Sequence, residues 1–227
     1  MCAAVRRART RVQAFGIALL VAVSAAGLAS CATKPRTERT GALVWRECGS
    51  IECASLSVPL DRAHPDGRKI HLALGRRPAD GKRRGVLLAN PGGPGGSGLE
   101  FLENSGAFSE SVRDHFDIVS WDPRGVGAST AVDCTDDLDF FYGVDRTNVE
   151  ASTVRDNVAV AKRFADACRR NGRGLLPFLS TRASVADMDA IRAAMGVRTI
   201  SYLGFSYGTY LGALYADAYP NLSLIHI

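Results

Sequence analysis

The pentapeptide Gly-Phe-Ser-Tyr-Gly at residues 204–208 contains residue types that perform nucleophilic catalysis. It matches the pattern G-x-S-x-G, follows an apolar run at 200–203 and precedes a helical run at 207–219. The turn between such a strand and helix is so sharp that glycine is needed on both sides of Ser206. The helix dipole at this point favours developing negative charge. The sequence therefore predicts Ser206 as a nucleophile.

A glycine-rich segment at residues 90–98, Asn-Pro-Gly-Gly-Pro-Gly-Gly-Ser-Gly, directly follows the apolar run 86–89. Glycines allow backbone N–H groups to come close to a reacting carbonyl oxygen. We expect the N–H groups of Gly93 and Tyr207 to form an oxyanion hole, with Gly92 as the alternative donor. A phosphate-binding loop is the competing interpretation, but no Gly-Lys-Ser/Thr follows and the two prolines lack N–H donors.

A third motif, Trp-Asp-Pro-Arg-Gly-Val-Gly-Ala-Ser at residues 121–129, closes the apolar run 118–121. We interpret Asp122 and Arg124 as structural residues that hold this turn beside the site.

Alternating strands and helices must position these motifs. Two amphipathic runs joined by the turn 64–67 predict antiparallel strands, and three short apolar runs predict buried parallel strands. Ser184, followed by Asp187, is expected to cap a helix. These patterns predict an α/β fold with a mostly parallel sheet and antiparallel N-terminal strands. The expected strands are 54–60, 69–74, 86–89, 118–121 and 200–203, and the expected helices are 154–170, 184–195 and 207–219.

In this order the three motifs resemble the α/β-hydrolase fold. The chain also resembles the secreted tripeptidyl aminopeptidases of actinobacteria, which are related to the proline iminopeptidases. The segments that carry this resemblance are 90–98 and 204–210, Glu-Cys-Ala at 52–54 and Val-Pro-Leu-Asp at 58–61. The resemblance runs from about Trp45 to Pro220. It implies a serine exopeptidase without a cofactor, which releases short peptides from the free N-termini of peptide substrates.

In this fold the catalytic acid and histidine follow the serine along the chain. After Ser206 the only acid is Asp217, inside the predicted helix, and the only histidine is His226, on a short tail. We therefore expect the triad acid and histidine to belong to a C-terminal part missing from this chain, and this fragment to be inactive alone. Three histidines precede the serine and are interpreted as structural or surface residues: His64, His71 and His115.

The last six residues, Leu-Ser-Leu-Ile-His-Ile at 222–227, are what CTG TCT CTT ATA CAC ATC encodes. That DNA resembles a transposon end used in sequencing libraries, so we expect 222–227 to be a sequencing artefact. The N-terminal part of the hydrolase domain then covers 45–221. The strand at 200–203 is expected to be an exposed sheet edge.

The first 30 residues are predicted to be a lipoprotein signal peptide. Arginines from Arg6 to Arg11 precede the apolar stretch 15–26, and Leu-Ala-Ser-Cys at 28–31 resembles a bacterial lipobox. Cys31 is expected to carry lipid, with residues 31–44 as a tether to the membrane. An ordinary secretory signal and a retained membrane anchor are the alternatives. Either signal predicts an exported protein, a cell-membrane lipoprotein or a secreted one.

Four further cysteines remain, and an even number in an exported chain indicates two disulfides with three possible connectivities. We expect the sequence-local pairs, Cys48 with Cys53 and Cys134 with Cys168. A zinc site is the competing interpretation, but the spacing of Cys48 and Cys53 and the lack of a suitable histidine argue against it. No metal site is predicted.

Composition limits the remaining function classes. The 227 residues are 46% hydrophobic and 22% charged, as in globular proteins, with a net charge of +5. Four arginines in the first 30 residues supply most of that charge, so a nucleic-acid partner is not expected. An esterase or lipase would use the same serine chemistry, and a non-catalytic binding lipoprotein is a further alternative. The intact residues 204–208 and 90–98 argue against the latter.

Overall fold

The structure is a computed structural model, and it describes residues 37–104, 106–147, 149–221 and 223–225. These residues belong to the unit Pro35–Ile227. The predicted signal peptide, the lipidation site Cys31 and His226 lie outside the described residues.

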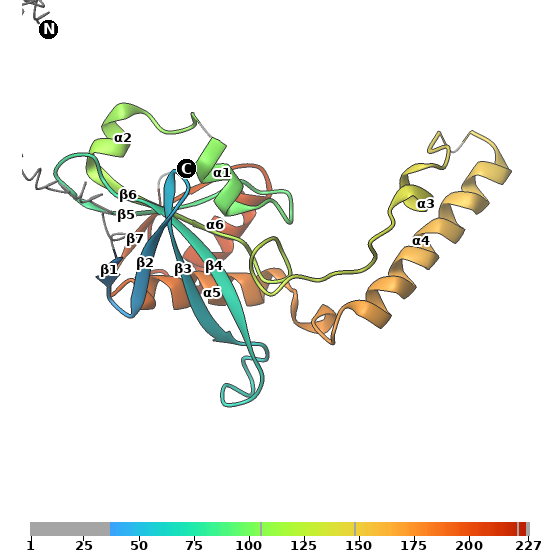
Figure 1. Ribbon diagram of the computed structural model, residues 1–227, viewed down its shortest axis with the longest axis horizontal. Helices are drawn as coiled ribbons and strands as arrows, with labels where there is room; N and C mark the ends of the chain where they lie inside the picture. The colour runs from blue at the N-terminus through green and yellow to red at the C-terminus, as the bar shows by residue number, and fades with distance from the viewer. Residues whose placement is uncertain (1–36, 105, 148, 222, 226–227) are drawn as a thin grey trace, which may run out of the picture. The chain divides into compact units, whose positions relative to one another are not determined.

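One mixed sheet organises the domain (Figure 1). Its order is β1-β2-β3-β4-β6-β5-β7-β8, with antiparallel pairing from β1 to β6 and parallel pairing among β6, β5, β7 and β8. The predicted α/β fold with antiparallel N-terminal strands is therefore confirmed, although antiparallel pairings outnumber parallel ones among the described strands. The strands are β1 (Thr37–Thr40), β2 (Leu43–Cys48), β3 (Ile51–Pro59), β4 (Lys69–Arg77), β5 (Gly85–Asn90), β6 (Phe116–Trp121), β7 (Ile200–Gly204) and β8 (Ser223–Ile225).

Helices cover both faces of this sheet because its central strands are apolar on both sides. Side chains of α5 and α6 join the larger core with β2, β3, β4 and β7, and α1 closes the smaller core on the other face through Leu102. No helix among the described residues is both long and apolar enough to cross a bilayer. The helices are α1 (Gly98–Asn104), α2 (Glu110–His115), α3 (Asp139–Tyr142), α4 (Ala151–Asn171), the 3-10 turn Leu176–Phe178, α5 (Thr181–Ala194) and α6 (Tyr207–Ala218).

The sheet is wider at both ends than the sequence predicted. β1 and the start of β2 lie within the expected tether 31–44, because Gly41 at φ +60° closes a tight hairpin between them. Leu43 is buried, so the folded part begins before Trp45. At the other end β8 pairs with β7, so the expectation that β7 is an exposed edge is wrong. Three residues of the expected artefact, Ser223–Ile225, form that strand.

The capping expectation for α5 is also wrong. The helix begins at Thr181, and the Ser180 hydroxyl accepts a hydrogen bond from the Ala183 N–H group at 3.2 Å. Ser184 is instead a buried residue inside the helix. The residues Ser-Thr-Arg-Ala at 180–183 gave no apolar period, so the first turn could not be recognised from the sequence.

Helix α4 forms where predicted, but the N-terminal half of its apolar face stays exposed and the rest is only partly buried. Val158 is 48% exposed, and the ring of Phe164 packs against Phe141 of the α3 helix at 4.9 Å between centroids. A disulfide joins Cys134 to Cys168 and ties the segment after β6 to the last turns of α4. A second disulfide joins Cys48 to Cys53 across the β2–β3 turn. These are the sequence-local pairs, not a zinc site.

Replacing Cys134 and Cys168 together by alanine should loosen the α3–α4 segment without unfolding the sheet. The bond closes a separation of 34 residues, for which chain entropy gives a local loss of about 3–4 kcal/mol. Limited proteolysis should then cut between residues 135 and 167 at a much higher rate. The matched control is the Cys48→Ala, Cys53→Ala variant, which should leave that rate unchanged. Equal cleavage of both variants would contradict the prediction.

Candidate active site

The three motifs meet at one edge of the sheet. Each follows the carboxyl end of one of three neighbouring parallel strands, β6, β5 and β7, and such ends lie side by side. The sequence-predicted site residues therefore come together, although 115 or so positions separate the first motif from the last.

Ser206 occupies the sharp turn between β7 and α6. Its backbone is at φ +51° and ψ −122°, a region that a non-glycine residue rarely adopts and that costs about 1–3 kcal/mol. The turn is tight because a Cβ on Gly204 would lie 2.4 Å from the carbonyl carbon of Gly208. Ser206 is exposed, and its hydroxyl makes no hydrogen bond to another described residue. The hydroxyl is therefore held open to solvent at the start of a helix.

The glycine-rich loop lies directly against this turn. A Cβ on Gly92 would lie 2.3 Å from the carbonyl oxygen of Phe205 and 3.0 Å from the N atom of Tyr207. The Gly92 N–H group donates to the Asn90 side chain at 2.9 Å. The N–H groups of Gly93 and Tyr207 have no partner among the described residues. The geometry therefore favours Gly93 and Tyr207 over Gly92 as oxyanion donors.

Asn90 is a positioning residue that sequence reasoning did not single out. It is fully buried at the end of β5, and its carbonyl oxygen accepts a hydrogen bond from Phe205 N–H at 3.0 Å. Its side chain accepts the Gly92 N–H, so one residue fixes both the loop and the turn. The signal was present, because a buried polar residue that ends an apolar strand needs local partners.

The Asp122 carboxylate connects the glycine-rich loop to the turn after β6. It is buried, and one oxygen accepts hydrogen bonds from the Ser97 hydroxyl at 2.7 Å and the Leu99 N–H at 3.2 Å. The other oxygen accepts from the Ala128 N–H at 2.7 Å. The predicted structural role of Asp122 therefore consists of three hydrogen bonds to one charged group, each stronger than a neutral one.

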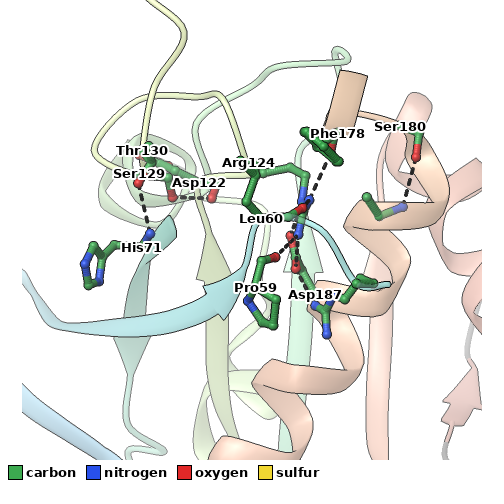
Figure 2. Close-up of polar contacts among 12 residues, drawn as sticks. Pro59, Leu60, His71, Asp122, Arg124, Ser129, Thr130, Phe178, Ser180 and Asp187 are labelled. Carbon is green, nitrogen blue, oxygen red and sulfur yellow. Dashed lines mark hydrogen bonds and ion pairs between the residues drawn. The ribbon is translucent and has the colours of Figure 1, made fainter. Parts of the chain in front are cut away.

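Arg124 forms a buried bidentate ion pair with Asp187 of α5 (Figure 2). Both N–O distances are 2.7 Å, and the two side chains are no more than 1% exposed. The guanidinium also donates to the carbonyl groups of Leu60 and Phe178, at 3.1 and 2.9 Å. Arg124 therefore joins three segments: the residue after β3, the 3-10 turn and helix α5.

A tyrosine hydroxyl fastens α6 to β7. Tyr202 donates to the Gly208 carbonyl oxygen at 2.8 Å. Burial raises the pKa of the Tyr202 hydroxyl far above its ordinary value, so this group stays a protonated donor. The first turn of α6, with its free N–H at Tyr207, is held in place by this bond.

No described histidine reaches Ser206. The His64 ring contacts Asp61, the His115 ring contacts the Ser111 carbonyl, and His71 lies on β4 with its ring directed away from the Asp122 turn (Figure 2). Asp217 is exposed in the last turn of α6, about 16 Å of helix rise beyond Ser206. The described residues thus contain a candidate nucleophile and candidate oxyanion donors, and none of the described histidines is bonded to them. They also contain no group of three or more His, Cys, Asp or Glu placed to hold a metal.

Known proteins that are similar to this chain carry the names of hydrolases and peptidases. A family profile described as alpha/beta hydrolase fold matches residues 85–224. The tripeptidyl aminopeptidase of Streptomyces lividans is 37% identical over 201 residues, which are 82% of this chain and 37% of that protein. The serine protease Hip1 of Mycobacterium tuberculosis is 40% identical over 184 residues, 76% of this chain and 34% of that protein. The chain thus spans little more than a third of the length of these relatives.

An esterase is also among the relatives. Carboxylesterase B of Mycobacterium tuberculosis is 39% identical over 157 residues, 65% of this chain and 30% of that protein. A crystal structure of the proline iminopeptidase from Mycobacterium smegmatis superimposes with a TM-score of 0.44 at 18% identity, over 74% of this chain and 41% of that one.

Replacing Arg124 by leucine should destabilise the domain by at most about 3–5 kcal/mol, because the buried Asp187 keeps only its partly exposed partner Arg62, at 2.6 Å. The double variant Arg124→Leu, Asp187→Leu should lose less than the sum of the two single variants. Urea unfolding of all three measures the coupling. The matched control is Arg169→Leu, which removes an exposed pair with Asp166 and should barely move the midpoint. Additive single losses would contradict the prediction.

Proposed function

We propose that this chain, which belongs to the alpha/beta hydrolase family, carries the nucleophile of an exported serine aminopeptidase. The observation that carries the proposal is Ser206 at φ +51° next to the unpaired N–H groups of Gly93 and Tyr207. The tripeptidyl aminopeptidase and serine protease relatives support a peptidase. Peptides with a free N-terminus are the proposed substrates.

In the proposed reaction the Ser206 hydroxyl attacks the carbonyl carbon of the scissile peptide bond. A C–O bond forms, the carbonyl oxygen becomes an oxyanion, and the N–H groups of Gly93 and Tyr207 stabilise its charge. The C–N bond then breaks, and the amine leaves with the proton that a histidine took from Ser206. Water hydrolyses the resulting acyl-enzyme and regenerates the hydroxyl.

The histidine and its acid are proposed to lie outside the described residues. In this fold they follow the nucleophile along the chain. None of the described histidines contacts Ser206, and the matched relatives are more than twice as long as this chain. A serine hydroxyl without its base is a weak nucleophile, and general-base catalysis contributes about 10²–10⁴-fold.

The protein that includes the complete triad should release peptides from the N-terminus of peptide amides, and Ser206→Ala should lower kcat/KM at least ~10³-fold. The matched control is Ser55→Ala, which removes the hydroxyl of an exposed serine on β3, away from the candidate site. The 227-residue chain alone should show no turnover above that of Ser206→Ala. Rapid Ser206-dependent turnover by the 227-residue chain would mean that its base lies within it.

The substrate preference of the protein that includes the complete triad should distinguish a peptidase from an esterase. Peptidyl amides with a free amino group are expected to be better substrates than acyl esters, and acetylation of the amino group should abolish cleavage. Preference for esters regardless of the amino group would assign an esterase, the activity named for one relative. Failure of a fluorophosphonate probe to label Ser206 in that protein would instead favour the non-catalytic binding role.

We also propose that Cys31 carries lipid and anchors the exported domain to the cell membrane. The lipobox-like Leu-Ala-Ser-Cys at 28–31 supports this proposal. Replacing Cys31 by serine should move the protein from the membrane fraction to the soluble fraction of cells. The neighbouring change Thr33→Ser should leave it in the membrane fraction. Wild-type protein found wholly outside the cell in soluble form would overturn lipidation.

A further inference from the structure

Four basic residues gather at the sheet edge opposite the candidate active site. Lys82, Arg83 and Arg84 directly precede β5, and Arg198 precedes β7, the neighbouring parallel strand. Arg83, Arg84 and Arg198 line one open hollow together with Phe116 and Val197. We name these four residues the basic cluster.

Three of the four charges are uncompensated. Lys82, Arg84 and Arg198 are exposed and form no ion pair with another described residue. Arg83 pairs with the buried Asp117 at 2.8 Å. Of the nearby exposed acids, Asp80 is directed to Arg113 at 3.9 Å. The cluster therefore presents a net positive surface to an outside partner.

The tip of the β1–β2 hairpin lies beside this cluster. The Ala42 N–H group donates to the Ala194 carbonyl at 2.8 Å, and a Cβ on Gly196 would lie 3.3 Å from the Gly41 Cα. Gly196 is two residues from Arg198. Strand β1 begins four residues before Gly41, which is about 13 Å of strand. The tip of the β1–β2 hairpin therefore lies close to the basic cluster.

The candidate active site lies far from the cluster along the same strand. Ser206 follows β7 and Arg198 precedes it, so eight residues of nearly extended chain separate them by about 25 Å. A surface bound at the cluster would leave Ser206 accessible to peptides. This separation exceeds the Debye length of about 8 Å at physiological salt. Electrostatic interactions between a surface bound at the cluster and charges near Ser206 are therefore largely screened.

We propose that the basic cluster binds the anionic phospholipid surface of the membrane and directs the active edge away from it. Guanidinium groups bind phosphate head groups through paired N–H donors, and Phe116 and Val197 supply apolar contact beside them. Membrane lipid is favoured over nucleic acid because the proposed lipid anchor, Cys31, precedes β1 by six residues, at most about 20 Å of chain, so this inference rests on the proposed lipidation. The proposal goes beyond the peptidase reaction and needs no catalysis.

Vesicle sedimentation tests the proposal with the full chain carrying Cys31→Ser, so that no lipid is attached. The wild-type cluster should bind vesicles of phosphatidylglycerol and phosphatidylcholine, and added salt should weaken binding. Reversing Lys82, Arg84 and Arg198 to glutamate should weaken it more than tenfold, since each basic residue near an anionic surface strengthens binding about fivefold. The matched control reverses three exposed basic residues elsewhere, Arg155, Lys162 and Arg182, and should bind as wild type.

Hydrogen exchange on the vesicles separates this surface from the N-terminal arginines, which all variants share. Amides at 82–85 and 197–199 should be protected, and those at 204–208 should not change. Equal vesicle binding by the two reversed variants, or protection confined to the first 36 residues, would overturn the proposal. Tighter binding to a DNA duplex than to the vesicles would overturn it in favour of a nucleic-acid surface. Circular dichroism of each variant establishes that the fold is retained.

Discussion

The Asp122 carboxylate ties the glycine-rich loop and the first turn of α1 to the turn after β6. Its two oxygens accept hydrogen bonds from the glycine-rich loop, from the first turn of α1 and from the turn after β6. The turn after β6 approaches this carboxylate so closely that a Cβ on Gly127 would lie 2.2 Å from one of its oxygens. A buried carboxylate is tolerated only when its lone pairs are satisfied. The glycine-rich loop, with the candidate donor Gly93, is therefore held in place by hydrogen bonding to this charge.

A second constraint is the close approach of the glycine-rich loop to the turn at Ser206. Asn90 accepts N–H groups from both segments, and Tyr202 fastens the first turn of α6 to the strand beneath it. The unfavourable φ of Ser206 persists because these neighbours determine its backbone. Such fixed donors stabilise an oxyanion without the reorganisation that water would need. The N–H groups of Gly93 and Tyr207, the candidate donors, are thus held in position without a bound substrate.

The two edges of the parallel strands have opposite chemical character. The carboxyl ends bear the serine and its glycine-rich loops, and the amino ends bear Arg84 and Arg198. This polarity follows from parallel strands, whose equivalent ends lie on one side. The exposed apolar residues of α4, such as Val154 and Val158, belong to neither edge. Helix α4 contacts α3 and the Cys134 disulfide, so it depends on that covalent bond more than the sheet does.

The sequence by itself determined the central elements and the candidate site. Short apolar runs indicated the central strands, G-x-S-x-G between a strand and a helix indicated Ser206 as the candidate nucleophile, and glycine density indicated the candidate oxyanion loop. Each of these signals is local, because it depends only on a short run of consecutive residues. The same locality explains the errors: no apolar period marked the first turn of α5 or the polar strand β1.

Only the tertiary structure decided which groups meet. Arg124 could have been assigned no partner from sequence, because Asp187 is 63 positions away and is reached only when α5 packs on the sheet. The choice of Gly93 over Gly92 depended on the Asn90 side chain occupying the Gly92 N–H group. The position of each histidine relative to Ser206 likewise depended on strand order and register. Contacts of this kind are fixed by packing between distant segments, which a pattern along the chain does not encode.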